Sequence, residues 1–184
     1  DQLMTRQHLL VSYNDELLKN RFYLLMRILL VKTSSLGDVI HNLPVAADLA
    51  RQFPGVEIDW CVEESFADVP RLSPVVRNVV PVAVRRWRKA LLQTNTWREL
   101  AEMRKRLGAG NYDAVLDTQG LLKSALITRQ AAGRRLGYTA DAAREPLAAS
   151  FYDATFPVPR DLHAVTRNRL LAGAAFGYTP AAEL

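Results

Sequence analysis

The chain has 184 residues, of which 49% are hydrophobic and 23% charged, so we expect one globular domain and exclude a disordered chain. Its one cysteine excludes an intrachain disulfide, which makes a reducing cytoplasm the expected compartment, and no apolar run approaches the roughly 20 residues of a membrane helix. The formal net charge of +5 indicates acidic partners: nucleic acid, phosphorylated ligands or an anionic membrane surface.

The first half of the chain predicts two strands and a helix after an irregular start. Residues 1–25 mix charged and apolar residues, and we treat them as an extension that precedes the domain. Arg27–Val31 is a nearly continuous apolar run, typical of a strand buried on both faces. A helix is predicted from Asp38 to about Gln52, and residues 56–62 predict a second strand. Cys61 lies in that strand and is expected in the core rather than as a catalytic thiol.

The second half continues to alternate between strands and helices. Helical segments are predicted at residues 65–72, 97–107, 121–132 and 163–175, and further strands at residues 79–84, 113–117 and 135–138. Gly177 is expected to end the last helix. Because strands that alternate with helices form right-handed crossovers, we predict one α/β domain with a doubly wound parallel sheet over residues 26–180.

The loop after the first strand, Lys32-Thr33-Ser34-Ser35-Leu36-Gly37-Asp38, is the first candidate ligand site, because ligands of such sheets bind beyond the carboxyl ends of the strands. Serine and threonine can cap the next helix, and Gly37 would let its backbone approach a ligand. The loop contains neither a P-loop nor a dinucleotide fingerprint, which disfavours a nicotinamide-dependent oxidoreductase. Asp38 could stabilise the helix dipole or accept a proton from an attacking hydroxyl, and its spacing does not separate these roles.

Other polar residues follow the later strands. Glu63-Glu64 and Asp117–Gly120 belong to the same edge of the predicted sheet and could contact a substrate or cap a loop. His163 and Arg167 share a helix face, which suits either an anion contact or a local pair. His41 is expected to be a surface or packing residue. No Cys/His cluster has the spacing of a metal site, so no metal is expected.

The basic block Arg85-Arg86-Trp87-Arg88-Lys89 follows the third strand. An aromatic side chain among four cations is typical of a clamp for nucleic acid or a sugar phosphate, and equally of a solvated loop. A basic α/β binding module for nucleic acid or phosphorylated ligands is therefore one interpretation of the chain.

Five collinear segments together favour another interpretation, because they resemble the lipopolysaccharide heptosyltransferases, in particular those of type I: Met26–Pro44, Ile58–Glu64, Arg85–Ala90, Asn111–Ser124 and Ala143–Leu147. The resemblance runs from Met26 to about Pro180. It implies the N-terminal, Rossmann-like half of a GT-B glycosyltransferase. Such an enzyme inverts configuration as it transfers heptose from ADP-heptose to the inner Kdo of Kdo-modified lipid A, and it needs no metal or other cofactor.

The resemblance also implies roles for particular residues. Asp38 would be the catalytic base. The substrate-binding residues would be Lys32, Thr33, Ser34, Ser35, Gly37, Arg85, Arg86, Lys89, Gln119, Arg129, Arg144 and His163. The expected setting is a monomer on the anionic cytoplasmic face of the inner membrane, with no nucleic acid bound. The family's C-terminal, donor-binding domain has no counterpart in the sequence, so we expect negligible transferase activity from this chain alone.

Overall fold

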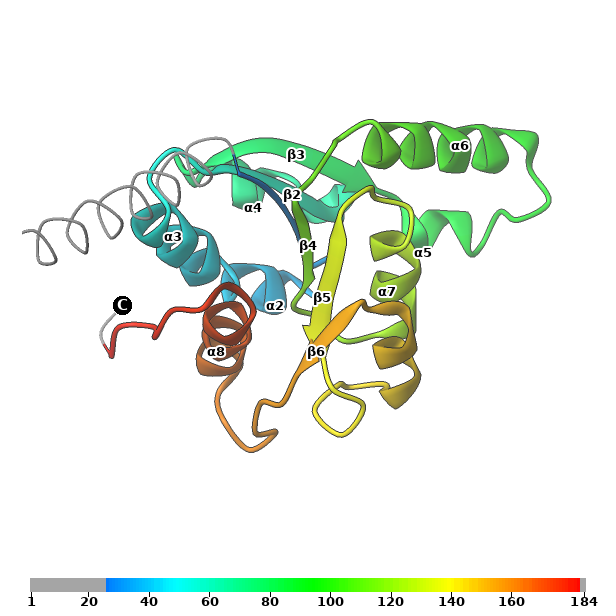
Figure 1. The fold of residues 1–184 in the computed structure, drawn as a ribbon. Coiled ribbons are helices and arrows are strands. Elements are labelled where there is room, and N and C mark those ends of the chain that lie inside the picture. The colour runs from blue at the N-terminus through cyan, green and yellow to red at the C-terminus, as the bar shows by residue number, and fades with distance from the viewer. Residues whose placement is uncertain (1–25, 183–184) are drawn as a thin grey trace, which may run out of the picture.

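The computed structural model describes residues 26–182, and the expected extension, residues 1–25, lies outside them. Six parallel strands form one sheet in the order β3-β2-β1-β4-β5-β6. The strands are β1 Arg27–Val31, β2 Glu57–Glu63, β3 Val76–Val82, β4 Ala114–Asp117, β5 Arg134–Tyr138 and β6 Ala154–Phe156. Helices cover both faces of this sheet (Figure 1), so the predicted doubly wound α/β architecture is confirmed.

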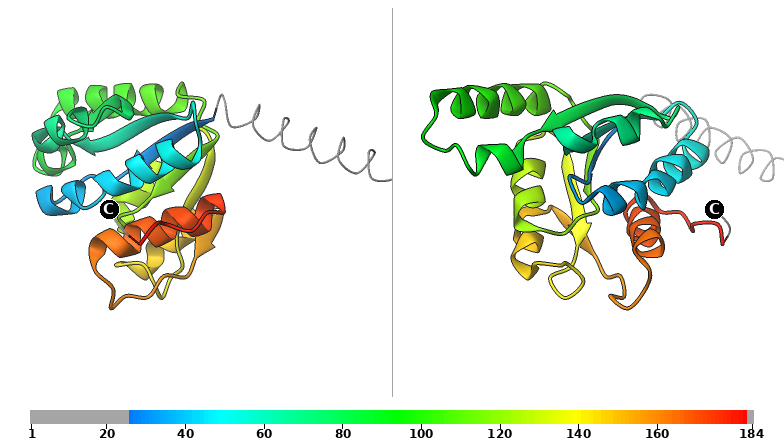
Figure 2. Two further views of the ribbon diagram at one scale, coloured as in Figure 1. Left: turned by 90° about the vertical axis from the view of Figure 1, so that its left-hand side faces the viewer. Right: turned by 180° about the vertical axis from the view of Figure 1, so that it is seen from behind.

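The helices divide into two layers. They are α2 Leu36–Ile40, α3 Leu43–Gln52, α4 Asp68–Arg71, α5 Val84–Trp87, α6 Thr94–Gly108, α7 Leu122–Thr128 and α8 Ala164–Phe176, with 3-10 turns at Glu64–Phe66 and Pro146–Phe151. Figure 2 shows α2, α3 and α8 on one side of the sheet and α6 and α7 on the other. None of the described helices is long and apolar enough to cross a membrane.

The central strand β1 is buried on both faces because its apolar run has no polar side chain to turn outward. Ile28 and Leu30 join the core on the α3 and α8 side. Leu29 and Val31 alternate with them and join the core on the α6 and α7 side. Cys61 of β2 lies in the second core, fully buried, and burial raises the pKa of its thiol. The prediction that Cys61 is a core residue is confirmed.

Several boundaries differ from the sequence-based prediction. The helix predicted from Asp38 to Gln52 is two helices, α2 and α3, which are separated at residues 41–42. Pro44 lies in the first turn of α3, where its missing N–H costs nothing, and that position favours a new helix start. The third strand is Val76–Val82 rather than residues 79–84, and Val84 begins α5. The three-residue strand β6 was not predicted, because so short a segment shows no periodicity.

The strand order brings two loops together at the carboxyl edge of the sheet. β1 lies between β2 and β4, and its last residue, Val31, pairs with Asp117 of β4. The Thr118 N–H donates to the Val31 carbonyl at 3.2 Å, so the loops that follow β1 and β4 leave the sheet side by side. This is the point at which the strand order reverses, where ligands of open α/β sheets bind.

Candidate functional site

The loop after β1 is tied to the loop after β4 by one buried amide. The Thr33 backbone N–H and hydroxyl both donate to Gln119 Oε1, each at 2.8 Å. The buried Asp117 carboxylate accepts the Gln119 N–H at 2.8 Å and the Gly120 N–H at 3.2 Å. Burial is the main reason that the pKa of Asp117 is raised above its ordinary value. Thr33 and Gln119 thus join two loops, and their predicted contact with a substrate stays a prediction.

Asp38 lies in the first turn of α2 and has two sets of partners. Its Oδ2 accepts the Ser35 backbone N–H at 3.0 Å and the Ser35 hydroxyl at 3.1 Å, so it closes the helix start. Its Oδ1 accepts a hydrogen bond from Arg144 Nη2 at 2.8 Å. Partial burial acts to raise the pKa of Asp38, but the Ser35 N–H, the Lys32 charge and Arg144 outweigh it, and the pKa falls below its ordinary value. Asp38 is therefore an ionised helix cap that faces the carboxyl edge, and its role as base stays a prediction.

Lys32 is a buried cation whose charge acts on this carboxylate. Its side chain is 2% exposed, and Nζ donates to the Thr118 carbonyl at 2.8 Å and to Asn168 Oδ1 of α8 at 3.4 Å. Burial lowers the pKa of Lys32 to about 8, although the negative charge of Asp38 acts in the opposite direction. Tyr138 donates to the same Asn168 oxygen at 3.2 Å. Neither Asn168 nor Tyr138 was predicted, because only the fold brings them to Lys32.

A second lysine reaches the same loop from α7. Lys123 Nζ donates to the Ser34 hydroxyl at 2.7 Å. Burial is the largest cause of its lowered pKa, and the nearby Arg85 and Arg88 charges lower it further. Sequence reasoning gave Lys123 no role, because its place in a predicted helix did not show which way it faced. Gly37 lies on the open side of the loop, where no heavy atom comes within 4 Å of a Cβ built on it.

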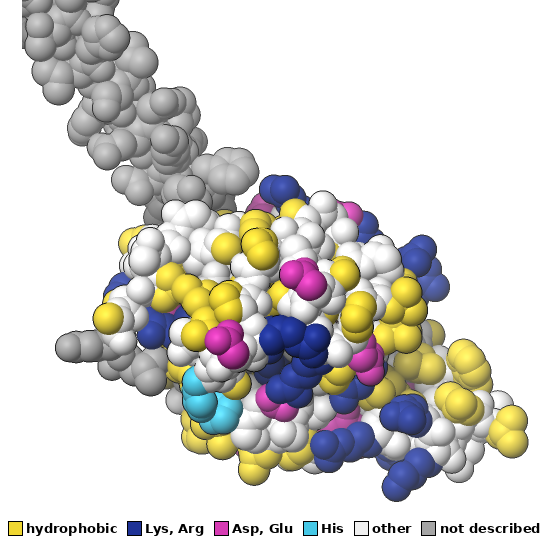
Figure 3. All heavy atoms as spheres, turned by 90° about the horizontal axis from the view of Figure 1, so that it is seen from below, with side chains coloured by type: hydrophobic (Ala, Val, Ile, Leu, Met, Phe, Trp, Pro, Cys, Tyr) yellow, Lys and Arg dark blue, Asp and Glu magenta, His cyan; other side chains and the backbone are white. Residues whose placement is uncertain are grey.

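Arg144 belongs to a loop that is held against the β4–α7 turn. Gly120 in that turn has φ +65° and lies close to the backbone of residues 143–144, so only glycine fits there without strain. Its carbonyl accepts the Glu145 N–H at 3.0 Å. Arg144, Lys32 and Gln119 then line a small polar recess together with Thr118, Tyr138, Ala164, Arg167 and Asn168. Figure 3 looks onto this edge, where Lys and Arg side chains gather at the middle with acidic side chains around them.

His163 and Arg167 of α8 have separate partners. His163 is the N-cap of α8, where its Nδ1 accepts the Val165 N–H at 3.3 Å, and its ring meets that of His41 edge to face at 5.1 Å. Arg167 lies over the Tyr138 ring at 5.0 Å and donates to the Ala142 carbonyl at 2.6 Å. His41 is thus a packing residue, as one reading of the sequence had it. Substrate contact by His163 stays a prediction.

The basic block after β3 is divided among different partners. Arg86 is paired with Glu64 at 3.1 Å and with Glu99 at 2.9 Å, so its charge is already balanced. The Arg85 guanidinium lies over the Phe66 ring at 5.1 Å, while Lys89 is exposed. Arg85, Arg86 and Lys89 lie near the carboxyl edge of the sheet, because α5 follows the end of β3.

Arg129 is the one predicted binding residue that the structure does not bring to this edge. It follows the last residue of α7 and lies over the Phe151 ring at 6.0 Å, near the start of β5. Among residues 26–182, no group of three or more His, Cys, Asp or Glu side chains is placed to hold a metal ion.

Known proteins resemble this chain in sequence. Residues 100–183 match the sequence model of glycosyltransferase family 9 (heptosyltransferase). The chain is 52% identical over 154 residues to lipopolysaccharide heptosyltransferase 1 of Pseudomonas aeruginosa and 48% identical over 155 residues to that of Escherichia coli. These matches cover 83% and 84% of this chain but 43% and 49% of the relatives. The chain thus spans about half the length of the curated relatives it matches.

Solved structures agree with the sequence matches. The Escherichia coli heptosyltransferase WaaC with ADP-2-deoxy-2-fluoro heptose superimposes with a TM-score of 0.84 at 46% identity, over 86% of this chain and 51% of that chain. A glycosyl transferase family 9 structure from Veillonella parvula has a TM-score of 0.68 at 17% identity, over 85% of this chain and 42% of its own, which supports the fold alone. The resemblance inferred from five sequence segments is confirmed, and the chain belongs to glycosyltransferase family 9, the heptosyltransferase family.

Proposed function

We propose that the protein transfers heptose from ADP-heptose to the inner Kdo of Kdo-modified lipid A in lipopolysaccharide core synthesis, and that this chain supplies the acceptor-binding half. The relatives named lipopolysaccharide heptosyltransferase 1 support the reaction class. The WaaC structures with ADP and with ADP-2-deoxy-2-fluoro heptose support the donor. No further cofactor is part of the proposal.

The observation that carries the proposal is the ionised Asp38 carboxylate, held by Ser35 and Arg144 at the carboxyl end of β1. In the proposed step the acceptor hydroxyl gives its proton to Asp38 while its oxygen bonds to the anomeric carbon of the heptose. The bond from that carbon to the diphosphate breaks, and ADP leaves with its electron pair. One displacement from the opposite face inverts the configuration. A carboxylate of low pKa is a weak base, so the proton moves late, as the new bond forms.

The cations around Asp38 suit an acceptor that carries carboxylates. Arg144 is 44% exposed, and its planar guanidinium can exchange Asp38 for an acceptor carboxylate in the same two-pronged geometry. The buried Lys32 ammonium adds positive charge that water screens little. Lys123 would hold the Ser34 hydroxyl toward the same space. The acceptor is thus proposed to bind over the loop of residues 32–38.

The test is heptose transfer by the full-length protein with Asp38→Asn. The amide keeps the size of the side chain and can still cap α2, but it cannot take a proton. We expect kcat to fall on the order of 100-fold to 10,000-fold, with little change in the KM for the acceptor. Asp68→Asn is the matched control, because Asp68 also lies in the first turn of a helix but is 94% exposed. If Asp38→Asn were as active as the Asp68→Asn control, Asp38 would not be the base. The 184-residue chain, assayed alone beside them, is expected to show negligible transfer.

A further inference from the structure

The Asp38 carboxylate is covered by the side chain that balances its charge. The Asp38 side chain is 14% exposed, whereas that of its partner Arg144 is 44% exposed. Asp38 Oδ2 accepts the N–H and the hydroxyl of Ser35, and Arg144 Nη1 lies 3.5 Å from it. Oδ1 has Arg144 Nη2 as its partner, at 2.8 Å. Oδ1 is therefore the oxygen left to accept from a hydroxyl, and the Arg144 guanidinium stands at it.

Arg144 has no second anion to which it can turn. Among residues 26–182, Asp38 is the only acid that forms an ion pair with Arg144. The recess beside this pair is lined by the Lys32 ammonium and the Arg167 guanidinium. Burial is the main cause of the lowered pKa of Lys32, and the charges of Arg144 and Arg167 lower it further. A swing of Arg144 away from Asp38 would thus leave it beside two other cations without a counter-ion.

The same recess contains buried donors without partners. Gln119 is 2% exposed, and its Nε2 has no hydrogen-bond partner among the residues that the structure describes. The buried Nε of Arg167 is unpaired there as well. Buried donors are normally satisfied by protein, water or a ligand. The recess has a volume of about 10 Å³, room for one oxygen atom, so its spare donors suit a single anionic oxygen.

Arg144 is held at its backbone, so its side chain can move alone. The Glu145 N–H donates to the Gly120 carbonyl at 3.0 Å, and the Glu145 carboxylate accepts the Leu122 N–H at 2.6 Å. The preceding residue, Ala143, is fully buried. A change of rotamer is therefore enough to take the guanidinium from Asp38 to a ligand at the recess.

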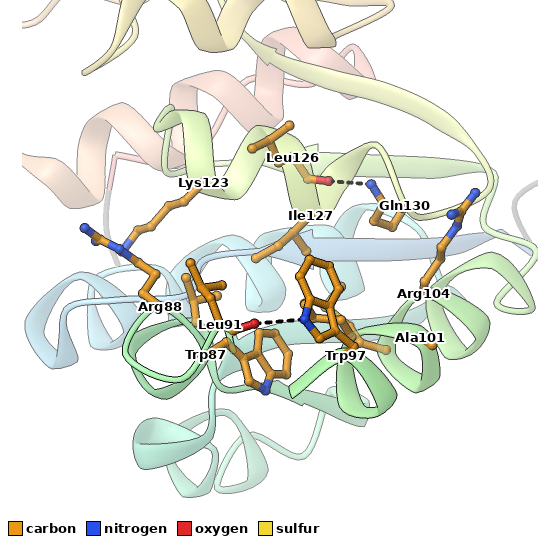
Figure 4. A pocket seen from close by; sticks show the side chains of 13 residues that line it. Trp87, Arg88, Leu91, Trp97, Ala101, Arg104, Lys123, Leu126, Ile127 and Gln130 are labelled. Carbon is orange, nitrogen blue, oxygen red and sulfur yellow. Dashed lines mark hydrogen bonds between the residues drawn. The ribbon is translucent and has the colours of Figure 1, made fainter. Parts of the chain in front are cut away.

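Other cations of this edge belong to a separate surface. Arg88 and Lys123 lie at one end of a groove of about 580 Å³ between α6 and α7, which Trp97 and Leu126 help to line (Figure 4). These helices cover the sheet face opposite α8, the helix that carries Arg167. Anionic groups far from the reacting hydroxyl can be met at the groove. A carboxylate on the acceptor sugar itself lies close to the hydroxyls of that sugar, so it can reach Arg144 as the hydroxyl reaches Asp38.

We propose that Arg144 is a gate over Asp38 and that a carboxylate of the acceptor sugar opens it. The carboxylate takes the guanidinium in two-pronged geometry, one of its oxygens accepts from Gln119 in the recess, and Asp38 Oδ1 is left free for the acceptor hydroxyl. The inference rests on the proposed function and goes beyond it. Until an acidic acceptor binds, the base is withheld from water and ADP-heptose is protected from hydrolysis. Arg144 thus sets acceptor specificity through the rate of the chemical step.

Hydrolysis of ADP-heptose by the full-length protein without acceptor tests the gate. In this reaction a water oxygen bonds to the anomeric carbon and its proton goes to Asp38, while the bond to the diphosphate breaks and ADP leaves with the electron pair. Arg144→Gln should raise the hydrolysis rate about tenfold, because a charged hydrogen bond no longer holds Oδ1, while heptose transfer falls. Arg144→Lys, which keeps the charge but not the fork, should hydrolyse at a rate between those of the parent and Arg144→Gln.

Two further variants make the hydrolysis assay specific. Asp38→Asn added to Arg144→Gln should remove the gain, because the freed base is lost. Arg160→Gln is the matched control, since Arg160 is an exposed arginine in the loop between β6 and α8, and it should hydrolyse at the parent rate. Hydrolysis that stayed at the parent rate in Arg144→Gln would overturn the gate and leave Arg144 as a binding residue only.

Carboxyl NMR of the 184-residue chain tests the gate without any transfer reaction. Acid titration should give a higher pKa for Asp38 in Arg144→Gln than in the parent chain, since a cation is lost. The methyl glycoside of Kdo should raise the pKa of Asp38 in the parent chain, and its uncharged methyl ester should not.

The NMR outcomes separate this inference from the proposed function. Equal pKa values of Asp38 in the parent chain and Arg144→Gln would overturn the contact on which the gate depends. A shift with inorganic phosphate but none with the glycoside would overturn the carboxylate as the group that opens it. If both expected NMR shifts were seen while the full-length protein transferred no heptose, the proposed function would fail and the gate over Asp38 would stand.

Discussion

At the scale of single residues, the site combines an ionised carboxylate with a lysine that burial makes easier to deprotonate. Sequence analysis could identify Asp38, Ser35 and Lys32, because the local sequence pattern predicts the strand, the loop and the helix start that follow one another there. Asn168 and Tyr138, which surround Lys32, were not. They come from α8 and β5, and no local pattern links them to residue 32.

The lowered pKa of Lys32 gives a prediction about stability. The pKa of Lys32 falls from 10.5 to about 8 on folding, so the protonated form of Lys32 destabilises the folded chain. This loss of unfolding free energy is largest below pH 8, where Lys32 is protonated in both the folded and the unfolded chain. It disappears as the pH rises toward 10.5, because the unfolded chain then also loses the Lys32 proton. Lys32→Met removes the penalty but also two hydrogen bonds. Relative to the parent chain, the variant should therefore lose about 2 kcal/mol of unfolding free energy between about pH 7.5 and about pH 9.5.

Urea unfolding of both proteins across that pH range measures the effect. Lys105→Met, an exposed lysine of α6, is the control and should track the parent chain at every pH. A difference between Lys32→Met and the parent chain that stayed constant with pH would contradict a lowered pKa.

At the scale of elements, helix direction decides which cations reach the site. Helical periodicity predicted a helix over residues 121–132, and α7 is indeed helical over Leu122–Thr128. Because α7 starts at the carboxyl edge and runs away from it, Lys123 in its first turn meets Ser34, while Arg129 after its end meets Phe151. The resemblance selected Arg129 by its charge, and only the fold shows that the two cations lie at opposite ends of one helix.

This contrast predicts different kinetics for two substitutions around one helix. In the full-length protein, Lys123→Gln should raise the KM for the acceptor on the order of tenfold, since a charged hydrogen bond to the site loop is lost. Arg129→Gln should leave both kcat and KM within about twofold of the parent values. Steady-state kinetics with varied acceptor concentration separate the two cases. If Arg129→Gln raised KM as much as Lys123→Gln, the acceptor would have to extend far beyond the carboxyl edge.

At the scale of the whole molecule, the alternating pattern of the sequence was enough to predict the sheet. It could not predict the layer to which each helix belongs, nor β6, because packing between distant segments decides both. Helix α8 illustrates this: its Arg169 Nε meets Asp48 Oδ2 of α3 at 2.6 Å, and both side chains are buried. The pair fixes the last helix of the described residues against one of the first.

Loss of this pair should destabilise the fold. Arg169→Met leaves Asp48 with only the exposed Arg51 as a cationic partner among the described residues, and we expect a loss of about 3 kcal/mol in unfolding free energy. Arg51→Met is the matched control and should cost less than about 1 kcal/mol, since Arg51 is 55% exposed. Urea denaturation at neutral pH measures both, and equal losses would argue against a special role for the buried pair.

The position of α8 also defines the shortest piece of this domain that we expect to fold stably. A polypeptide cut after Phe156 would keep all six strands of the sheet. It would nevertheless leave Asp48 without Arg169 and Lys32 without Asn168, and it would open the apolar faces of α3 and β5 to water. Shortened versions made for crystallography or ligand screening should therefore retain the chain through Phe176, even though the sheet itself ends twenty residues earlier.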